Sequence, residues 1–328
     1  MGRRRLLIIK HGFSETCDHK VSSVVSLGDV FRCTCLLEAF YGWEVTWITS
    51  VAAADLLTEN HLIDHLYLAD EPKSLPDGAI SGHYDKLVNL EKQQDWCEFA
   101  LEVSAGERFG FRDWAASGDE AFYPASAKAL ATALHGHEYR SMQETLFATI
   151  GLEWRGERYR LGYRPRIIPI YDIGLNHHVG SKWPTKLWPK KNWDALYNIL
   201  SEHYSVSWQQ SLNSVRHYIE WLSSNRLIIT CDSLGLHLAI GLRRKLVGLF
   251  GPTSAELIYL YGLGMKVTAP CDRSCMPCFQ SRCDYSESCM DMITVDMVVD
   301  AVRELMPPQS RIQPPRIEAA TPIGAALL

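Results

Sequence analysis

A chain of 328 residues with a formal net charge of -5 has room for two domains, and it lacks the basic excess typical of general nucleic-acid binding. Its composition, 47% hydrophobic and 22% charged, is that of a globular protein, and no apolar run approaches the ~18 residues needed to span a membrane. The basic start Arg3–Arg5 precedes an apolar stretch, Leu6–Ile9, that is too short for a signal peptide. We therefore expect a cytoplasmic protein whose ten cysteines are mostly reduced.

The first half of the chain alternates apolar runs with segments of helical spacing. Apolar, β-branched and aromatic runs predict strands, and apolar residues every three or four positions predict helices. In chain order we predict strand 4–10, helix 29–42, strand 43–50, helix 51–60, a strand within 61–70 and strand 84–90. This order predicts a parallel sheet with helices on both faces.

The second half repeats the same rhythm. In chain order we predict strand 164–176, helix 192–203, strand 204–208, helix 214–224, strand 225–232, helix 234–242, strand 245–251 and helix 294–305. The charged stretch 156–166 reads as a linker, and the proline-rich stretch 307–328 as a disordered tail. We therefore predict an α/β protein of two Rossmann-like, doubly wound domains, 1–158 and 159–306, which face each other across a central cleft.

Three loops follow predicted strands, where open parallel sheets bind their ligands. In the first, Gly28 allows a tight turn, and Asp29 lies in or just before the first helical turn. A carboxylate there is favourable by about 0.3–1 kcal/mol as a helix-end charge, which is one interpretation of Asp29. The other is a general base at the cleft, kept ionised by the helix and effective through its position.

The second loop begins where strand 225–232 ends. The turn Asp232–Gly235 leads into a helix whose first backbone N–H groups can bind a phosphate. Asp232 would repel that anion, so it is better suited to accept hydrogen bonds from sugar hydroxyls. His237, one helical turn further, could donate to a phosphate oxygen or could simply be a packed core residue.

The third loop, 174–193, is rich in Gly, Pro, Trp and Lys. Its lysines are available to a diphosphate, although each could equally be a solvated surface residue: Lys182, Lys186, Lys190 and Lys191. The sequence has no GxxxxGK[ST], no GxGxxG and no D-x-D, so it lacks the usual P-loop, dinucleotide and carboxylate-held Mg²⁺ motifs. Phosphate charge would have to be met by lysines and helix N-termini.

In this order, the three loops resemble glycosyltransferase family 9, the ADP-heptose:lipopolysaccharide heptosyltransferases. The resemblance covers about 5–305 and rests on Ile9-Lys10 with Ser26–Asp29, on KWPTKLWP (Lys182–Pro189), on CDSLGLHLA (Cys231–Ala239) and on LFGPTS (Leu249–Ser254). It implies a GT-B fold with an N-terminal acceptor-binding domain and a C-terminal domain that binds the nucleotide sugar.

The resemblance also implies roles for individual residues. Asp29 matches the general base, Lys186 the phosphate-binding lysine, and Asp232 the carboxylate that contacts the donor sugar. The start of the diphosphate-binding helix corresponds to Ser233, Leu234, Gly235 and His237. Catalysis is then expected to be independent of a metal or other cofactor.

The sequence departs from the family pattern at three places. Residues 11–25 form an insertion where the acceptor should bind, Gly235 lies one position later than usual, and the stretch after Trp208 is short. Gln209 or Gln210 is the candidate nucleotide contact there.

Five of the cysteines are concentrated between Cys271 and Cys289. Similar cysteines occur in many family members. Three interpretations remain open for the segment: a structural Zn or Fe site, free thiols or a disulfide. The candidate metal ligands are Cys275, Cys278, Cys283 and Cys289.

The function that the resemblance implies is transfer of a heptose from ADP-heptose to a hydroxyl of a lipopolysaccharide core sugar. The basic residues Arg3–Arg5 could contact the anionic surface of the inner membrane. Two alternatives stay open: a glycosyltransferase with a protein or small-molecule acceptor or a different nucleotide sugar, and a non-catalytic binding or assembly protein with a metal-bound cysteine finger.

Overall fold

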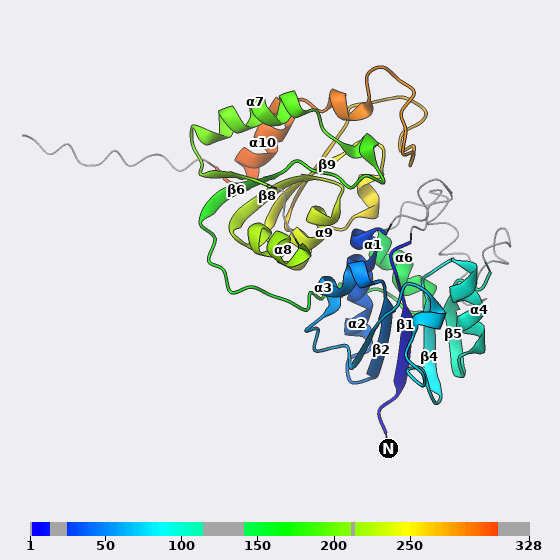
Figure 1. The fold of residues 1–328 in the computed structure, drawn as a ribbon. Helices are drawn as coiled ribbons and strands as arrows, with labels where there is room; N and C mark the ends of the chain where they lie inside the picture. The colour runs from blue at the N-terminus through cyan, green and yellow to red at the C-terminus, as the bar shows by residue number, and fades with distance from the viewer. Residues whose placement is uncertain (1, 14–24, 114–140, 211–213, 308–328) are drawn as a thin grey trace, which may run out of the picture.

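The computed structural model describes residues 2–13, 25–113, 141–210 and 214–307. Most of the insertion 11–25, and all of the predicted tail after Pro307, lie outside the described residues. Two parallel five-stranded sheets form the framework, one in each half of the chain (Figure 1). The predicted architecture of two doubly wound α/β domains is therefore confirmed.

The N-terminal sheet has the order β3-β2-β1-β4-β5, so the chain leaves the central strand first to one side and then to the other. Its strands are β1 (Arg5–Ile9), β2 (Glu44–Thr49), β3 (His65–Leu68), β4 (Tyr84–Asn89) and β5 (Ala105–Gly110). Its helices are α1 (Leu27–Arg32), α2 (Leu36–Ala39), α3 (Ala54–Leu57), α4 (Gln94–Glu102) and α6 (Met142–Thr149).

The predicted helix 29–42 differs from the structure in two ways. The helix begins at Leu27, after Ser26 as N-cap, and a 3-10 turn at Cys33–Cys35 separates α1 from α2. The side chains of Thr34 and Cys35 donate to backbone carbonyls three residues earlier, and this local bonding competes with a regular helix.

The C-terminal sheet has the order β10-β9-β8-β6-β7. Its strands are β6 (Tyr171–Asn176), β7 (Val206–Trp208), β8 (Asn225–Cys231), β9 (Lys245–Phe250) and β10 (Gly264–Thr268). Helices α7 (Lys190–Ser201) and α10 (Val295–Leu305) lie on one face, and α8 (Val215–Ser223) and α9 (Leu234–Gly241) on the face turned toward the N-terminal domain (Figure 1). Strand β6 starts later than predicted, because Pro165 and Pro169 have no N–H to donate to a ladder.

The predicted linker 156–166 lies against the N-terminal domain. The backbone N–H of Arg158 donates to Glu38, and that of Arg160 donates to Thr34. Tyr159 and Leu161 of this segment are buried. The connection between the domains is thus part of the core.

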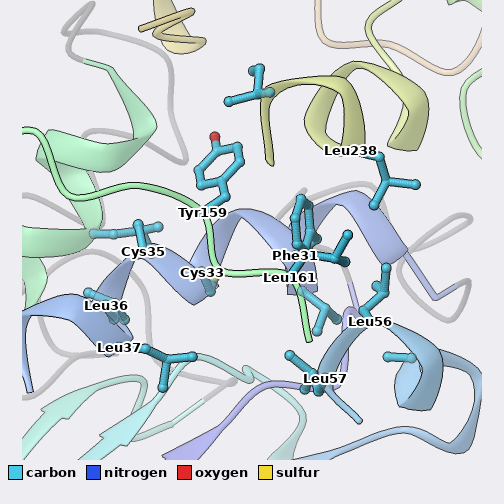
Figure 2. Close-up of a cluster of buried hydrophobic side chains, with 14 of the residues drawn as sticks. Phe31, Cys33, Cys35, Leu36, Leu37, Leu56, Leu57, Tyr159, Leu161 and Leu238 are labelled. Carbon is cyan, nitrogen blue, oxygen red and sulfur yellow. The ribbon is translucent and has the colours of Figure 1, made fainter. Parts of the chain in front are cut away.

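One apolar core continues from the first domain into the second. Phe31 of α1, Tyr159 and Leu161 of the linker and Leu238 of α9 belong to the same cluster (Figure 2). A Cβ atom on Gly241 would lie 2.5 Å from Phe31 Cζ, so the ring occupies the space that any side chain at position 241 would need. The two domains are therefore held together by close packing of α1 against α9.

The helices of the described residues include none long and apolar enough to cross a membrane.

Replacement of Phe31 by Ala is expected to lower the free energy of unfolding by about 3–5 kcal/mol, because the ring is fully buried and its loss leaves a cavity between the domains. Urea denaturation followed by fluorescence measures this change. The control is Tyr41→Ala, which removes an aromatic ring that is 81% exposed. Equal stability of the two variants would contradict a core shared by the domains.

Candidate active site between the two domains

Asp29 lies in the first turn of α1, as predicted, and forms an ion pair with Arg32 one turn later. Asp29 Oδ1 is 3.0 Å from Arg32 Nη2, and the two side chains are 17% and 12% exposed. The backbone N–H of Ser26, the N-cap residue, donates to the carbonyl oxygen of Gly12. The carboxylate of Asp29 is therefore engaged by a cation.

The charge of Asp29 is set by its surroundings. Burial raises the pKa of Asp29, but the cations Arg32, Lys10 and Lys182 and a hydrogen bond with Ser26 lower it by more. The net result is a pKa well below the ordinary range, so Asp29 is a carboxylate at neutral pH. Lys182 comes from the C-terminal domain, so both domains contribute charge here.

Gly28 has a different role from the predicted one. It lies within α1, and its φ is not in the left-handed region. A Cβ atom at this position would lie 2.9 Å from His237 Cδ2 of α9. Gly28 is thus needed because the start of α1 touches His237 across the domain boundary.

Lys186 and Asp232, from two loops of the C-terminal domain, form an ion pair that was not predicted. Lys186 Nζ lies 2.7 Å from Asp232 Oδ2, and the hydroxyl of Thr253 donates to the same oxygen at 2.8 Å. Burial raises the pKa of Asp232, but Lys186, His237 and the two hydrogen bonds lower it further than burial raises it. Asp232 is therefore held both ionised and oriented.

His237 is 4% exposed and lies within electrostatic range of both carboxylates. Burial lowers its pKa to about 4, against the opposing effect of Asp232 and Asp29 and with a further contribution from Arg32 and Lys186. The imidazole is neutral at pH 7, and its Nδ1 has no hydrogen-bond partner among the described residues. A buried polar atom without a hydrogen-bond partner costs stability, so a ligand that formed a hydrogen bond with Nδ1 would remove this cost.

The start of α9 is closely packed. Asn176 Nδ2 donates to Thr230 Oγ1 at 2.7 Å and to Ser233 Oγ at 3.2 Å, while Tyr218 OH donates to Asn176 Oδ1. A Cβ atom on Gly235 would lie 2.2 Å from both Asn176 Nδ2 and Tyr218 OH, which explains the glycine at its displaced position. The first N–H groups of α9, those of Leu234 and Gly235, make no hydrogen bond within the described ranges and suit an anion.

Other predicted contacts lie apart from this group. Lys190 pairs with Asp194 one turn later and is exposed, and Lys191 is exposed too. Lys190 borders a recess of about 450 Å³ whose other lining residues are His177, Asp194, Tyr197, Asn198 and Trp208. The backbone N–H of Gln209 donates to Leu175, with the side chain half-buried, and Gln210 is exposed. Neither glutamine lines this recess.

The cysteine-rich segment is partly assembled. The thiols of Cys278, Cys283 and Cys271 lie near enough to Cys289 to raise its pKa, in addition to the larger effect of burial, and Cys275 acts similarly on Cys278. Yet no three His, Cys, Asp or Glu side chains of the described residues are arranged to hold a metal ion. The geometry therefore does not fit a metal as it stands, and the Zn or Fe stays a prediction.

Three residues around Asp29 and Asp232 had no predicted role. Lys10, fully buried after β1, pairs with Glu91 at 3.3 Å, and Glu91 Oε1 accepts from the backbone N–H groups of His11 and Gly12. Arg32 and Thr253 complete the set. Lys10 follows a predicted strand, and Arg32 follows Asp29 by one helical turn. Both positions could therefore have been predicted from the sequence. The Thr253 contact depends on the fold.

The fold is the two-domain GT-B architecture, which several solved glycosyltransferases share. Escherichia coli heptosyltransferase WaaC, solved with ADP, has a TM-score of 0.59 at 16% identity, covering 92% of this chain and 99% of that chain. A glycosyl transferase of family 9 from Veillonella parvula DSM 2008 gives 0.59 at 15%, covering 92% and 97%. The iron-containing dodecameric glycosyltransferase TibC from enterotoxigenic E. coli H10407 gives 0.57 at 15%, covering 92% and 76%.

The sequence model of glycosyltransferase family 9 (heptosyltransferase) matches residues 211–288. No curated protein sequence matches the chain significantly. At these identities the solved structures establish the fold, and the family match lies on the segment that contains Asp232 and His237. The resemblance to a heptosyltransferase-like glycosyltransferase family, predicted from the motifs, is thereby confirmed.

Replacement of Arg32 by Gln is expected to raise the pKa of Asp29 and to destabilise the protein at neutral pH by about 1.5–3 kcal/mol, because a partly buried carboxylate loses its charged partner. Since the folded-state pKa of Asp29 lies below its ordinary value of 3.8, the stabilisation is present above that pH and disappears as the pH falls below it. The difference between variant and wild type should shrink accordingly.

Denaturation at a series of pH values measures this effect. Arg3→Gln, which breaks the exposed pair of Arg3 with Asp64, is the matched control and should cost less. A pH-independent difference for Arg32→Gln would show that its cost comes from packing.

Elemental analysis of the purified protein tests the structural metal. If the cysteines rearrange around Zn or Fe, close to one metal ion per chain is expected, and Cys278→Ser should reduce it strongly. Cys97→Ser, a buried cysteine in the other domain, is the control. Metal-free protein of full stability would overturn the prediction.

Proposed function

We propose that the protein transfers a heptose from ADP-heptose to a hydroxyl of a lipopolysaccharide core sugar. The observation that carries this proposal is that Asp29 and Asp232, one from each domain, both interact electrostatically with the neutral His237. Lys186 forms an ion pair with Asp232 at the same place. Such a site offers a base from one domain and a phosphate-binding cation from the other.

The donor is proposed to lie on the C-terminal domain. Lys186 and the first N–H groups of α9 would bind the diphosphate, and Asp232 would accept hydrogen bonds from the sugar hydroxyls. Supporting evidence for the nucleotide comes from E. coli heptosyltransferase WaaC, which has been solved with ADP and with ADP-2-deoxy-2-fluoro heptose. Gln209 and Gln210 remain the candidates for contact with the base.

In the proposed reaction, Asp29 takes the proton of the acceptor hydroxyl as its oxygen bonds to the anomeric carbon. The bond from that carbon to the diphosphate breaks at the same time, and ADP leaves. Lys186 and the N-terminus of α9 stabilise the charge that develops on the diphosphate. No residue in this sequence of steps requires a metal. The low pKa of Asp29 keeps it unprotonated, so it would act through its position.

The acceptor is proposed to approach from the N-terminal domain, on the side of α1. A core sugar of lipopolysaccharide at the cytoplasmic face of the inner membrane is the proposed acceptor. The basic residues Arg3–Arg5 are proposed to contact the membrane surface, although Arg3 and Arg5 also form ion pairs with Asp64 and Glu44.

Asp29→Asn is expected to reduce transfer by about 10²- to 10⁴-fold, because the amide cannot accept the proton, while ADP binding stays intact. Transfer assays with ADP-heptose, together with thermal shifts in ADP, measure the two properties separately. The control, Asp64→Asn, removes a carboxylate paired with an arginine far from the interface. Undiminished transfer by Asp29→Asn would reject Asp29 as the base.

Lys186→Ala is expected to weaken the ADP binding that Asp29→Asn leaves intact, and the same assays measure it. Loss of a charged hydrogen-bond donor is expected to weaken ADP binding by about 10- to 100-fold. A wild-type thermal shift with UDP-, GDP- or CMP-sugars and none with ADP or ADP-heptose would retain a glycosyltransferase but reject the heptose donor.

A further inference from the structure

The cysteine-rich segment Cys271–Cys289 touches the loops that hold the Lys186–Asp232 pair. The hydroxyl of Thr185, the residue before Lys186, donates to the backbone carbonyl of Gln280 at 2.7 Å. These two residues lie 95 positions apart in the sequence. The segment therefore reaches the lysine that is proposed to bind phosphate.

A second contact ties the segment to the other side of the pair. The backbone N–H of Phe279 donates to the carbonyl of Pro252 at 2.9 Å, next to Thr253, whose hydroxyl donates to Asp232. At the end of the segment, a Cβ atom on Gly251 would lie 2.7 Å from Cys289 Sγ. The segment is thus packed against the loop after β9 at two places.

A third contact lies just beyond the segment. Trp188, two residues after Lys186 and fully buried, donates its indole N–H to the carbonyl of Ile293 at 2.9 Å. Lys186 is therefore bracketed by two hydrogen bonds, one from Thr185 and one from Trp188, to the stretch between β10 and α10. Figure 1 shows this stretch beside the loop that joins β6 to α7.

We propose that the cysteine-rich segment is a supporting segment that holds Lys186 and Thr253 in contact with the carboxylate of Asp232. Thr185 is then the positioning residue, because its hydrogen bond to Gln280 connects the backbone beside Lys186 to this supporting segment. Lys186 has a long, flexible side chain, so its reach toward a diphosphate depends on where its backbone is held. Fixing that backbone in advance reduces the ordering that donor binding must otherwise supply. This inference rests on the proposed function, which supplies the nucleotide as ligand.

The test removes one hydroxyl. Thr185→Val keeps the shape of the side chain and loses the hydrogen bond to Gln280, and it is expected to weaken ADP binding by about 2- to 10-fold in calorimetry. Thr185→Ser restores the donor and should bind ADP as the wild type does. Thr58→Val is the matched control, since the Thr58 hydroxyl donates to Ala54 at 2.8 Å on the N-terminal domain.

A positioning role also predicts a particular kinetic pattern. Thr185→Val should raise the KM for the donor while kcat at saturating donor and the KM for the acceptor stay unchanged, whereas general damage to the fold would lower kcat. Gly251→Ala, which places a methyl group against Cys289, is a second variant and should weaken ADP binding in the same way.

The outcomes separate the two proposals. If Lys186→Ala weakens ADP binding and Thr185→Val does not, the positioning role of the cysteine-rich segment is rejected and the proposed function stands. If wild-type protein binds neither ADP nor ADP-heptose, the proposed function is rejected, and the positioning role of the cysteine-rich segment is rejected with it. If Thr185→Ser is as weak as Thr185→Val, the hydrogen bond is not the link.

Discussion

The contact between α1 and α9 is the constraint on which the proposed site depends. Each helix offers a glycine to a ring of the other: Gly28 lies against His237, and Gly241 lies against Phe31. Because neither position has room for a Cβ atom, the two helices approach more closely than ordinary side chains would allow. This approach brings Asp29 of one domain and Asp232 of the other within electrostatic range of the same histidine.

The charges at the interface follow from this packing. A carboxylate removed from water is stable when a cation and hydrogen bonds compensate for the lost solvation. Arg32 does this for Asp29, and Lys186 with Thr253 does it for Asp232. The pairs also give the site a fixed electrostatic pattern before any ligand binds. Under the proposed function, the diphosphate binds to a lysine already held in place, which reduces the reorganisation required during reaction.

Much of the fold follows from local sequence patterns. Where the observed elements differ from the predicted ones, the cause is local or topological. Strands buried on both faces read as continuous apolar runs, as in β1, where four of five residues are fully buried apolar side chains. Strand β5, AGERFG, lacks such a run because it is an edge strand in which only Phe109 and Gly110 are buried, and it was not predicted. In the structure, Asp29 and the Lys186–Asp232 pair act electrostatically on the same histidine, His237, whereas Lys190 pairs with Asp194.

The sequence by itself determined most of the alternating strands and helices and the loops that carry polar residues, because these depend on periodicities of two and 3.6 residues within short segments. It did not indicate α4, β5, α6 or β10. Only the tertiary structure decided which distant residues contact one another. Lys186 meets Asp232 across 46 positions, Lys10 meets Leu90 and Glu91 across about 80 positions, and Thr185 meets Gln280 across 95. Such contacts require the register of two sheets and the docking of two domains. No local pattern encodes these distances, because they result from the packing of the whole chain.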